Sequence, residues 1–181
     1  MIVTLLALCA LQDEAPDYFP LKVGNEWRFK GDEGEIVWSI EKSEKVGDAE
    51  CLVMKTVSKI GDQQKTVRTW ITTGKEGVDV HKTDEEEVKP SQPWIKVPLK
   101  KGEKWTSKYK GGTSSFQVGA EADLRVPAGK FKCFPVSESF RGKRTYTITY
   151  WFAKDTGPVR VRWVEAGMQL DFNLVKFTPG K

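Results

Sequence analysis

Histidine, the residue that most often carries catalytic chemistry, occurs once in this chain of 181 residues, as His81. One histidine excludes a metal site built on two or more histidines, and a nucleophilic triad would have to use His81. No G-x-S-x-G nucleophile elbow accompanies it. We therefore interpret His81 as a surface or strand-end residue, and we predict no catalytic residue, metal or cofactor.

Acidic side chains are the next candidates for chemistry. Residues 84–87 form an Asp-Glu-Glu-Glu run without the alternating oxygen ligands and glycine of a calcium loop. Such a run is typical of a solvated linker. Two carboxyl groups can hydrolyse a glycosidic bond when the fold brings them together, although no spacing here selects a pair. A carboxylate-based extracellular hydrolase is therefore an alternative function.

Two tryptophans occupy strand faces that are otherwise polar. Trp70 shares its face with Arg68 and Thr72, and Trp151 shares its face with Thr149. A tryptophan in such a place is either covered by another element or available to a ligand. We predict that Trp70 and Trp151 line one concave surface that binds an apolar or sugar-like ligand. The alternative is that both rings pack under loops.

The amino-terminal residues predict where the protein works. Residues 2–11 form an uncharged apolar run followed by the polar stretch QDEAPD. The run is too short for a membrane-spanning helix, which needs about 20 residues, and it suits the apolar core of an export signal. No Lys or Arg precedes it, so a buried first strand is the alternative. We predict that residues 1–12 are an export signal and that the protein is extracytoplasmic.

The three cysteines leave two questions open. Residues 6–9 resemble a bacterial lipobox, in which Cys9 would carry lipid, although Leu8 departs from the small residue that the motif prefers. Cleavage after Ala10 is the alternative. Cys51 and Cys133 would form a disulfide in an oxidising compartment or stay as two buried thiols. A lipid on Cys9 is the only membrane contact that we predict.

Composition indicates a soluble globular protein. Hydrophobic residues make up 39% of the chain and charged residues 30%. Lys and Arg number 29 against 25 Asp and Glu, which gives a net charge of +4. The cations are mixed with acids along the chain, so we predict no nucleic-acid partner.

A nine-residue motif occurs twice, as FPLKVGNEW at residues 19–27 and as VPLKKGEKW at residues 97–105. Further matches follow at a shift of about 80 residues, among them Cys51 with Cys133 and Gly77 with Gly157. We predict a duplicated unit with copies at 18–88 and 96–178 that share one core. Residues 83–94, which are acidic and contain two prolines, are the predicted linker.

Most segments alternate apolar and polar residues with a period of two. Residues 36–40, 116–126, 145–152 and 159–163 all follow this pattern, and glycine-containing turns separate them. No segment has a helical period. The sequence predicts an all-β protein whose antiparallel twisted sheet, or open barrel, has about nine to eleven strands in two similar halves.

Three ordered motifs carry a family resemblance. They are YFPLKVGNEW at 18–27, VPAGKFKC at 126–133, and YWFA at 150–153 with Gly157 and Val159 after it. In these motifs the chain resembles a group of exported bacterial proteins of uncharacterised function. The resemblance implies export and a β-rich fold, and it brings no catalytic residue, cofactor or substrate.

These observations favour a non-catalytic exported protein of the cell envelope that binds a partner protein or a small apolar ligand. The hydrolase is one alternative. A carbohydrate-binding module that uses exposed tryptophans is the other.

Overall fold

The computed structural model describes residues 17–84 and 86–181, and in these ranges every regular element is a β-strand. All the strand pairs are antiparallel, and they join the strands into one sheet. The strands are β1 (Glu26–Gly31), β2 (Gly34–Val46), β3 (Ala49–Ile60), β4 (Gln63–Gly74), β5 (Gly77–Thr83), β6 (Glu87–Lys96), β7 (Lys104–Tyr109), β8 (Gly112–Val118), β9 (Ala122–Val126), β10 (Gly129–Gly142), β11 (Thr145–Ala153), β12 (Gly157–Glu165) and β13 (Met168–Thr178).

The all-β prediction is confirmed, but the sheet has thirteen strands and not nine to eleven. One strand that the sequence concealed is β6, which lies in the segment interpreted as a linker and buries Val88 and Trp94. Its prolines, Pro90 and Pro93, are tolerated because β6 is the last strand on one side of the sheet and needs no hydrogen-bond donors there. The other difference lies in residues 116–126, which the alternation predicts as one strand. The structure divides this segment into β8 and the short strand β9, which pairs only with β10.

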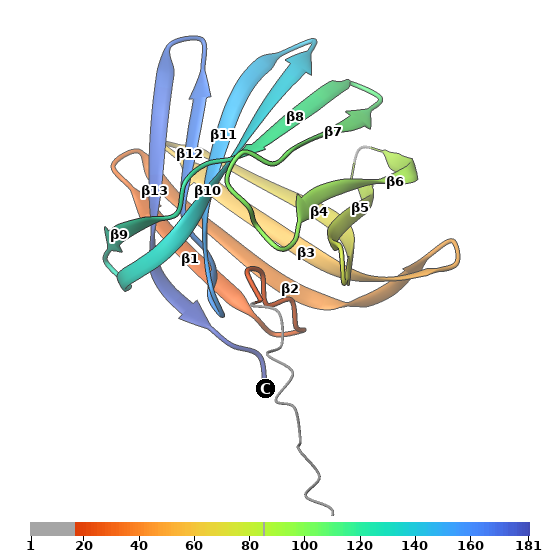
Figure 1. The fold of residues 1–181 in the computed structure, drawn as a ribbon, viewed down its shortest axis with the longest axis horizontal. Helices are drawn as coiled ribbons and strands as arrows, with labels where there is room; N and C mark the ends of the chain where they lie inside the picture. Colours follow the sequence, from red (N-terminus) through yellow and green to blue (C-terminus); the bar gives the residue numbers. More distant parts are fainter. Residues whose placement is uncertain (1–16, 85) are drawn as a thin grey trace, which may run out of the picture.

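The sheet curls into a nearly closed barrel (Figure 1). The strand order around it is β6-β5-β4-β3-β2-β1-β13-β12-β11-β10-β8-β7. Each half of the chain therefore forms a meander of six strands, β1 to β6 in the first half and β7, β8 and β10 to β13 in the second. An antiparallel ladder, with one register shift between Arg28 and Phe29, joins β1 to β13, and the two end strands, β6 and β7, meet on the other side.

The duplicated motif forms the same turn at the start of each meander. Gly24 and Gly102 have positive φ values of 90° and 85°, a conformation that glycine adopts without steric cost. The Gly24 amide donates to the Ile40 carbonyl at 2.9 Å, and the Gly102 amide donates to the Val118 carbonyl at 2.8 Å. Each turn is therefore tied to the second strand of its own meander, in the middle of β2 in the first case and at the end of β8 in the second.

Other matched residues also fall at equivalent places. Cys51 and Cys133 lie in the third strands, β3 and β10, and Gly77 and Gly157 begin the fifth strands, β5 and β12. The duplicated unit itself stays a prediction from the sequence.

Aromatic side chains fill the inside of the barrel. The largest fully buried side chains include Trp27, Phe29, Phe152 and Phe172. Phe19, which precedes β1, packs against this core with its ring centroid 5.5 Å from that of Trp27 and 5.6 Å from that of Phe152. Burying a phenylalanine in this way contributes roughly 1.5–3 kcal/mol. The segment before β1 is therefore an integral part of the core.

Candidate functional site

Buried polar side chains are concentrated in the second meander. The described residues include four buried polar or charged ones, of which Ser107, Ser114 and Glu138 lie on the neighbouring strands β7, β8 and β10. The fourth, Asn25, is structural, because its side chain bonds the carbonyl of Pro20 and the amide of Gly180. A buried polar group destabilises a fold unless it is hydrogen-bonded, so the group around Glu138 is the natural place to look for a site.

Hydroxyl groups surround the Glu138 carboxyl. The Ser114 hydroxyl donates to Oε1 at 2.5 Å, and the Tyr150 hydroxyl lies 3.5 Å from Oε2. The Ser107 hydroxyl is beside them on β7 and donates to the carbonyl of Pro93 on β6 at 2.5 Å. We refer to Ser107, Tyr109, Ser114, Glu138 and Tyr150 as the Glu138 cluster.

Burial controls the ionisation of this cluster. It raises the pKa of Glu138, and the hydrogen bonds from Ser114 and Tyr150 oppose that shift without cancelling it. Burial also raises the pKa values of Tyr109 and Tyr150, and the nearby Glu138 carboxyl adds to both shifts. The environment thus favours the neutral carboxylic acid, which can both donate and accept a hydrogen bond.

A row of three stacked rings lies on the same face of the sheet. The ring centroids of Phe140 and Tyr146 are 4.9 Å apart, and so are those of Tyr146 and Trp163. All three side chains are half-buried. Phe140 follows Glu138 by two residues on β10, so the two side chains point to the same face. We refer to Phe140, Tyr146 and Trp163 as the aromatic row.

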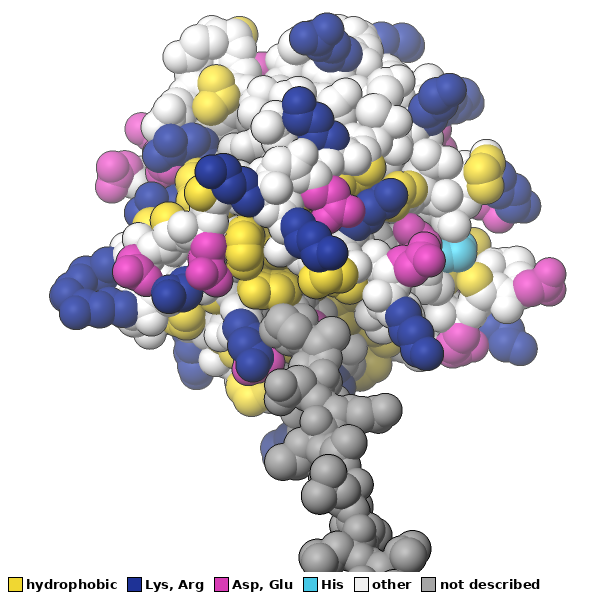
Figure 2. Space-filling model, in the orientation of Figure 1, with side chains coloured by type: hydrophobic (Ala, Val, Ile, Leu, Met, Phe, Trp, Pro, Cys, Tyr) yellow, Lys and Arg dark blue, Asp and Glu magenta, His cyan; other side chains and the backbone are white. Residues whose placement is uncertain are grey.

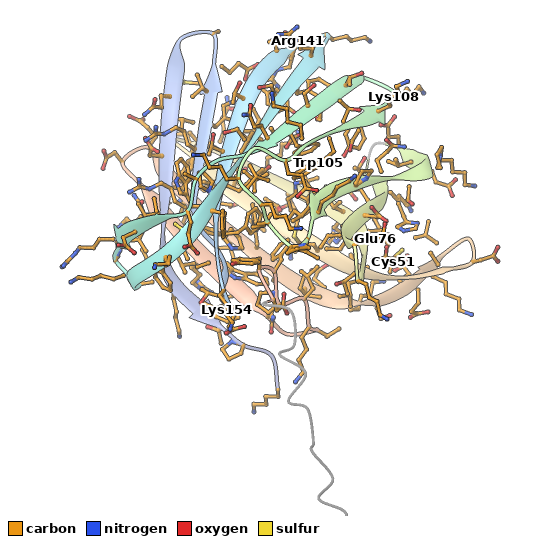
Figure 3. The ribbon with its side chains drawn as sticks, in the orientation of Figure 1. Cys51, Glu76, Trp105, Lys108, Arg141 and Lys154 are labelled. Atoms are coloured by element: carbon orange, nitrogen blue, oxygen red, sulfur yellow. The ribbon has the colours of Figure 1, made fainter. Side chains whose placement is uncertain are left out.

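Glycines make room for the first ring of the row. A Cβ atom on Gly112 would lie 2.8 Å from the Phe140 ring, and one on Gly142 would lie 3.0 Å from it. Both glycines are at the hairpin ends beside the ring, and Figure 3 labels the neighbouring Arg141 at the end of β10. The aromatic row therefore lies at this end of the barrel, while Trp105 is in the middle of the molecule in the same view.

Trp70, the first ligand-binding candidate from the sequence, is buried. It packs with Cys51 and Val53 in a small cluster separate from the main core. Its indole N–H donates to Glu44 at 3.2 Å, and the ammonium of Lys82 lies 4.3 Å from the ring centroid. The polar face on which Trp70 lies is therefore covered at this position.

Trp151, the second candidate, is half-buried on β11. The guanidinium carbons of Arg160 and Arg162 are each 5.6 Å from its ring centroid. Trp70 is on the fourth strand of the first meander and Trp151 is on the fourth strand of the second, six places apart in the strand order. The two rings therefore do not line one surface, contrary to the prediction.

The cysteines of the described residues are free thiols. Cys51 lies in the small cluster with Trp70, and Cys133 lies in the main core. Burial raises the pKa of both thiols, to about 11 for Cys133. Cys9 and the export signal predicted at 1–12 lie outside the described residues.

Over the ranges that the structure describes, no three or more His, Cys, Asp and Glu side chains gather where they could hold a metal ion. His81 lies with its Nε2 atom 3.0 Å from the Thr72 hydroxyl. The described part of the chain also has no helix long and apolar enough to cross a membrane. On the face shown in Figure 2, Lys and Arg side chains are scattered among Asp and Glu.

Sequence reasoning missed Glu138 although the signal was present. Residues 136–140 read Val-Ser-Glu-Ser-Phe, so strand alternation places Glu138 on the apolar face with Val136 and Phe140. An acid at an inward position of a buried strand is the pattern that would have identified it.

Comparison with known proteins finds two solved structures that resemble this chain. No family model matches the chain, and no curated protein matches it. One similar solved structure, from Parabacteroides distasonis ATCC 8503, is described as a "putative lipoprotein"; it is 13% identical, covers 91% of this chain and 100% of its own, and has a TM-score of 0.44. Another, from Bacteroides fragilis NCTC 9343, is described as a "putative exported protein with YmcC-like fold"; its identity and coverage are the same, and its TM-score is 0.46. At these values neither structure carries an argument about the activity of this chain.

Proposed function

We propose that this chain is a non-catalytic exported protein that binds a small, largely apolar ligand where the aromatic row adjoins the Glu138 cluster. One observation carries the proposal: three half-buried stacked rings stand beside the main group of buried polar side chains in an otherwise apolar interior. Ligand sites combine an apolar lining with a few polar groups that fix orientation, and this arrangement provides both.

A ligand is favoured over a partner protein by the position of the row. Tyr146 shares its face of β11 with the buried residues Ile148, Tyr150 and Phe152, which is the face that points into the barrel. A protein partner would more readily contact side chains on the outside of the sheet.

Binding is favoured over hydrolysis by the surroundings of Glu138. Hydrolysis of a glycosidic bond uses two carboxyl groups about 5–10 Å apart. Glu138 is the one buried acid among the described residues, and its hydrogen-bond partners are hydroxyl groups of Ser114 and Tyr150. A neutral acid held in this way is suited to orienting the polar end of a ligand.

Export is the second part of the proposal, and it rests on the apolar run at residues 2–11. Intact mass of the protein recovered from the envelope of a producing bacterium tests it. A chain that begins after Ala10, or at a lipid-modified Cys9, supports export; a chain that still begins at Met1 contradicts it.

Titration with the neutral fluorescent probe N-phenyl-1-naphthylamine tests the binding site. We expect saturable fluorescence enhancement that Tyr146→Ala weakens about tenfold, because removing the central ring breaks the row. Trp151→Ala is the matched control, because it removes a half-buried ring from the opposite face of the same strand, five residues further along. Equal affinity in the Tyr146 variant, or no saturable enhancement in the unaltered protein, contradicts the proposed site.

Carbohydrate binding by Trp151 is the second candidate function. The ring is half-buried, and on the same outer face the hydroxyls of Ser137 on β10 and Thr149 on β11 lie 3.0 Å apart. Flat rings flanked by hydroxyl groups suit sugars. Glycan-array binding that Trp151→Ala abolishes would favour this function over the first.

A further inference from the structure

The barrel is joined differently at two places. On one side β1 and β13 form an antiparallel ladder from Glu26 opposite Thr178 to Lys30 opposite Asn173. On the other side β6 and β7 are the ends of the strand order, and the described residues form no ladder between them. We refer to the meeting of β6 and β7 as the seam.

Side chains bridge the seam. The Lys108 amide donates to Oε1 of Gln92 at 2.8 Å, and the Lys110 amide donates to Oε1 of Glu86 at 3.1 Å. The Ser107 hydroxyl forms the third bridge, to the carbonyl of Pro93. Each bond has a side chain at one end, so β6 and β7 can separate by side-chain rotation without breaking any strand pairing.

The sequence of β6 keeps the seam from closing into a ladder. Pro90 and Pro93 have no backbone N–H, so β6 lacks donors at two of its positions. The acceptors at the seam are the side chains of Gln92 on β6 and of Glu86 just before β6. They bond the Lys108 amide on β7 and the Lys110 amide just after β7. Among the described residues, the seam is thus the one junction around the barrel where the neighbouring strands share no ladder.

The Glu138 cluster, which is one part of the proposed binding site, lies directly behind the seam. Ser107 and Tyr109 belong both to β7 and to the Glu138 cluster. On the β6 side, the Trp94 ring meets the Tyr150 ring edge to face, with 5.9 Å between their centroids. Separating β6 from β7 would uncover the cluster and part these two rings.

We infer that the seam opens to admit the ligand to the Glu138 cluster, and that its side-chain bridges set the rate of entry. This inference rests on the function proposed above. Among the routes that pass between neighbouring strands, the seam is the one where access costs no strand pairing, because entry between any other pair would break a ladder.

Hydrogen exchange tests the opening without a ligand. We expect the Lys108 and Lys110 amides, followed by NMR, to exchange about a hundredfold faster than hydrogen-bonded amides in the β1–β13 ladder. Equal protection of the two junctions would overturn the inference, whatever the outcome of the probe titration.

Cross-linking tests the role of the seam in entry. In a full-length chain with Cys9→Ser, the variant Gln92→Cys/Lys108→Cys is bridged by a short reducible bis-methanethiosulfonate linker. The matched control is Arg28→Cys/Lys176→Cys, whose positions are exposed register partners across β1 and β13. Cys51 and Cys133 are fully buried and stay unreacted.

Stopped-flow binding of N-phenyl-1-naphthylamine gives the readout. We expect the seam linker to slow both binding and release about tenfold, with recovery on reduction, while the control linker leaves both rates unchanged. Unchanged rates with the linked seam would overturn the inference and leave the proposed function intact. If the unaltered protein does not bind the probe, the proposed function fails, and hydrogen exchange still decides whether the seam opens.

Discussion

Trp27 and Trp105 occupy the same place in the two meanders, but only Trp27 has a partner for its indole N–H among the described residues. The Trp27 indole donates to the Thr156 carbonyl at 2.6 Å. The indole nitrogen of Trp105 is buried and has no hydrogen-bond partner within residues 17–84 and 86–181. Both rings stack on another aromatic ring, Trp27 on Phe177 and Trp105 on Phe116.

This asymmetry predicts different costs for the same substitution. Trp27→Phe loses a hydrogen bond and leaves the Thr156 carbonyl without its donor, whereas Trp105→Phe removes a buried donor that has no acceptor. We expect Trp27→Phe to lower the free energy of unfolding by about 1–2 kcal/mol more than Trp105→Phe does. Urea denaturation of the two variants measures the difference, and equal losses would contradict it.

The motif that contains these tryptophans also shows what the sequence could predict of the fold. Two similar antiparallel halves are predicted from three features of the sequence. These are the glycine before each tryptophan, the alternation after it and the shift of about 80 residues between the copies. Strand β6 escaped prediction because proline normally ends a strand, and only its place at the end of the sheet makes Pro90 and Pro93 acceptable. Such a position depends on the whole topology and leaves no local pattern.

Glu138 should make stability depend on pH. Burial raises its pKa above the value in the unfolded chain, so the folded state keeps a proton that the unfolded state has released. The free energy of unfolding should therefore fall as the pH rises from about 4.3, the ordinary pKa of glutamate, through the raised pKa of folded Glu138. Thermal unfolding from pH 4 to 9 measures this slope.

Glu138→Gln is the matched variant for that measurement. Glutamine keeps the shape and the hydrogen-bonding capacity of the neutral acid and has no proton to lose. We expect the fall in melting temperature with rising pH to become shallower in this variant. The same slope in both proteins would show that Glu138 is not the group that titrates.

The thiols give a direct test of the disulfide that the sequence left open. Cys51 and Cys133 are both buried, and burial raises their pKa values. In protein that has not met a reductant, we expect neither thiol to react with Ellman's reagent until denaturant is added, and then both to react. Two unreactive cysteines after unfolding would instead indicate a Cys51–Cys133 disulfide.

Gly157 should be much less replaceable than Gly167, although both have positive φ, 86° and 83°. A Cβ atom on Gly157 would lie 3.2 Å from both the Phe19 ring and the Trp27 indole nitrogen, whereas one on Gly167 meets nothing within 4 Å. Gly167→Ala should cost about 1–2 kcal/mol of backbone strain, and Gly157→Ala should cost clearly more. Urea denaturation decides, and equal costs would show that the core yields at Gly157.

The candidate site was less predictable than the fold, for a physical reason. The alternation of apolar and polar residues predicts which side chains share a strand face. It identifies Trp70 and Trp151 as tryptophans on otherwise polar faces. It could not tell that Glu44 and Lys82 cover Trp70, because these residues come from other strands. The aromatic row was equally hidden, since Phe140, Tyr146 and Trp163 meet only when three strands are in register.

The ladder between β1 and β13 has a consequence for the order of events in the cell. Because β1 hydrogen-bonds to β13, the barrel cannot be completed until the ribosome has made residue 178, which is the register partner of Glu26 on β13. Pairing over so great a sequence separation is slow, which leaves a newly made polypeptide time to remain unfolded. If the chain is exported as proposed, a translocation channel that accepts only unfolded chains would therefore receive it in a suitable state.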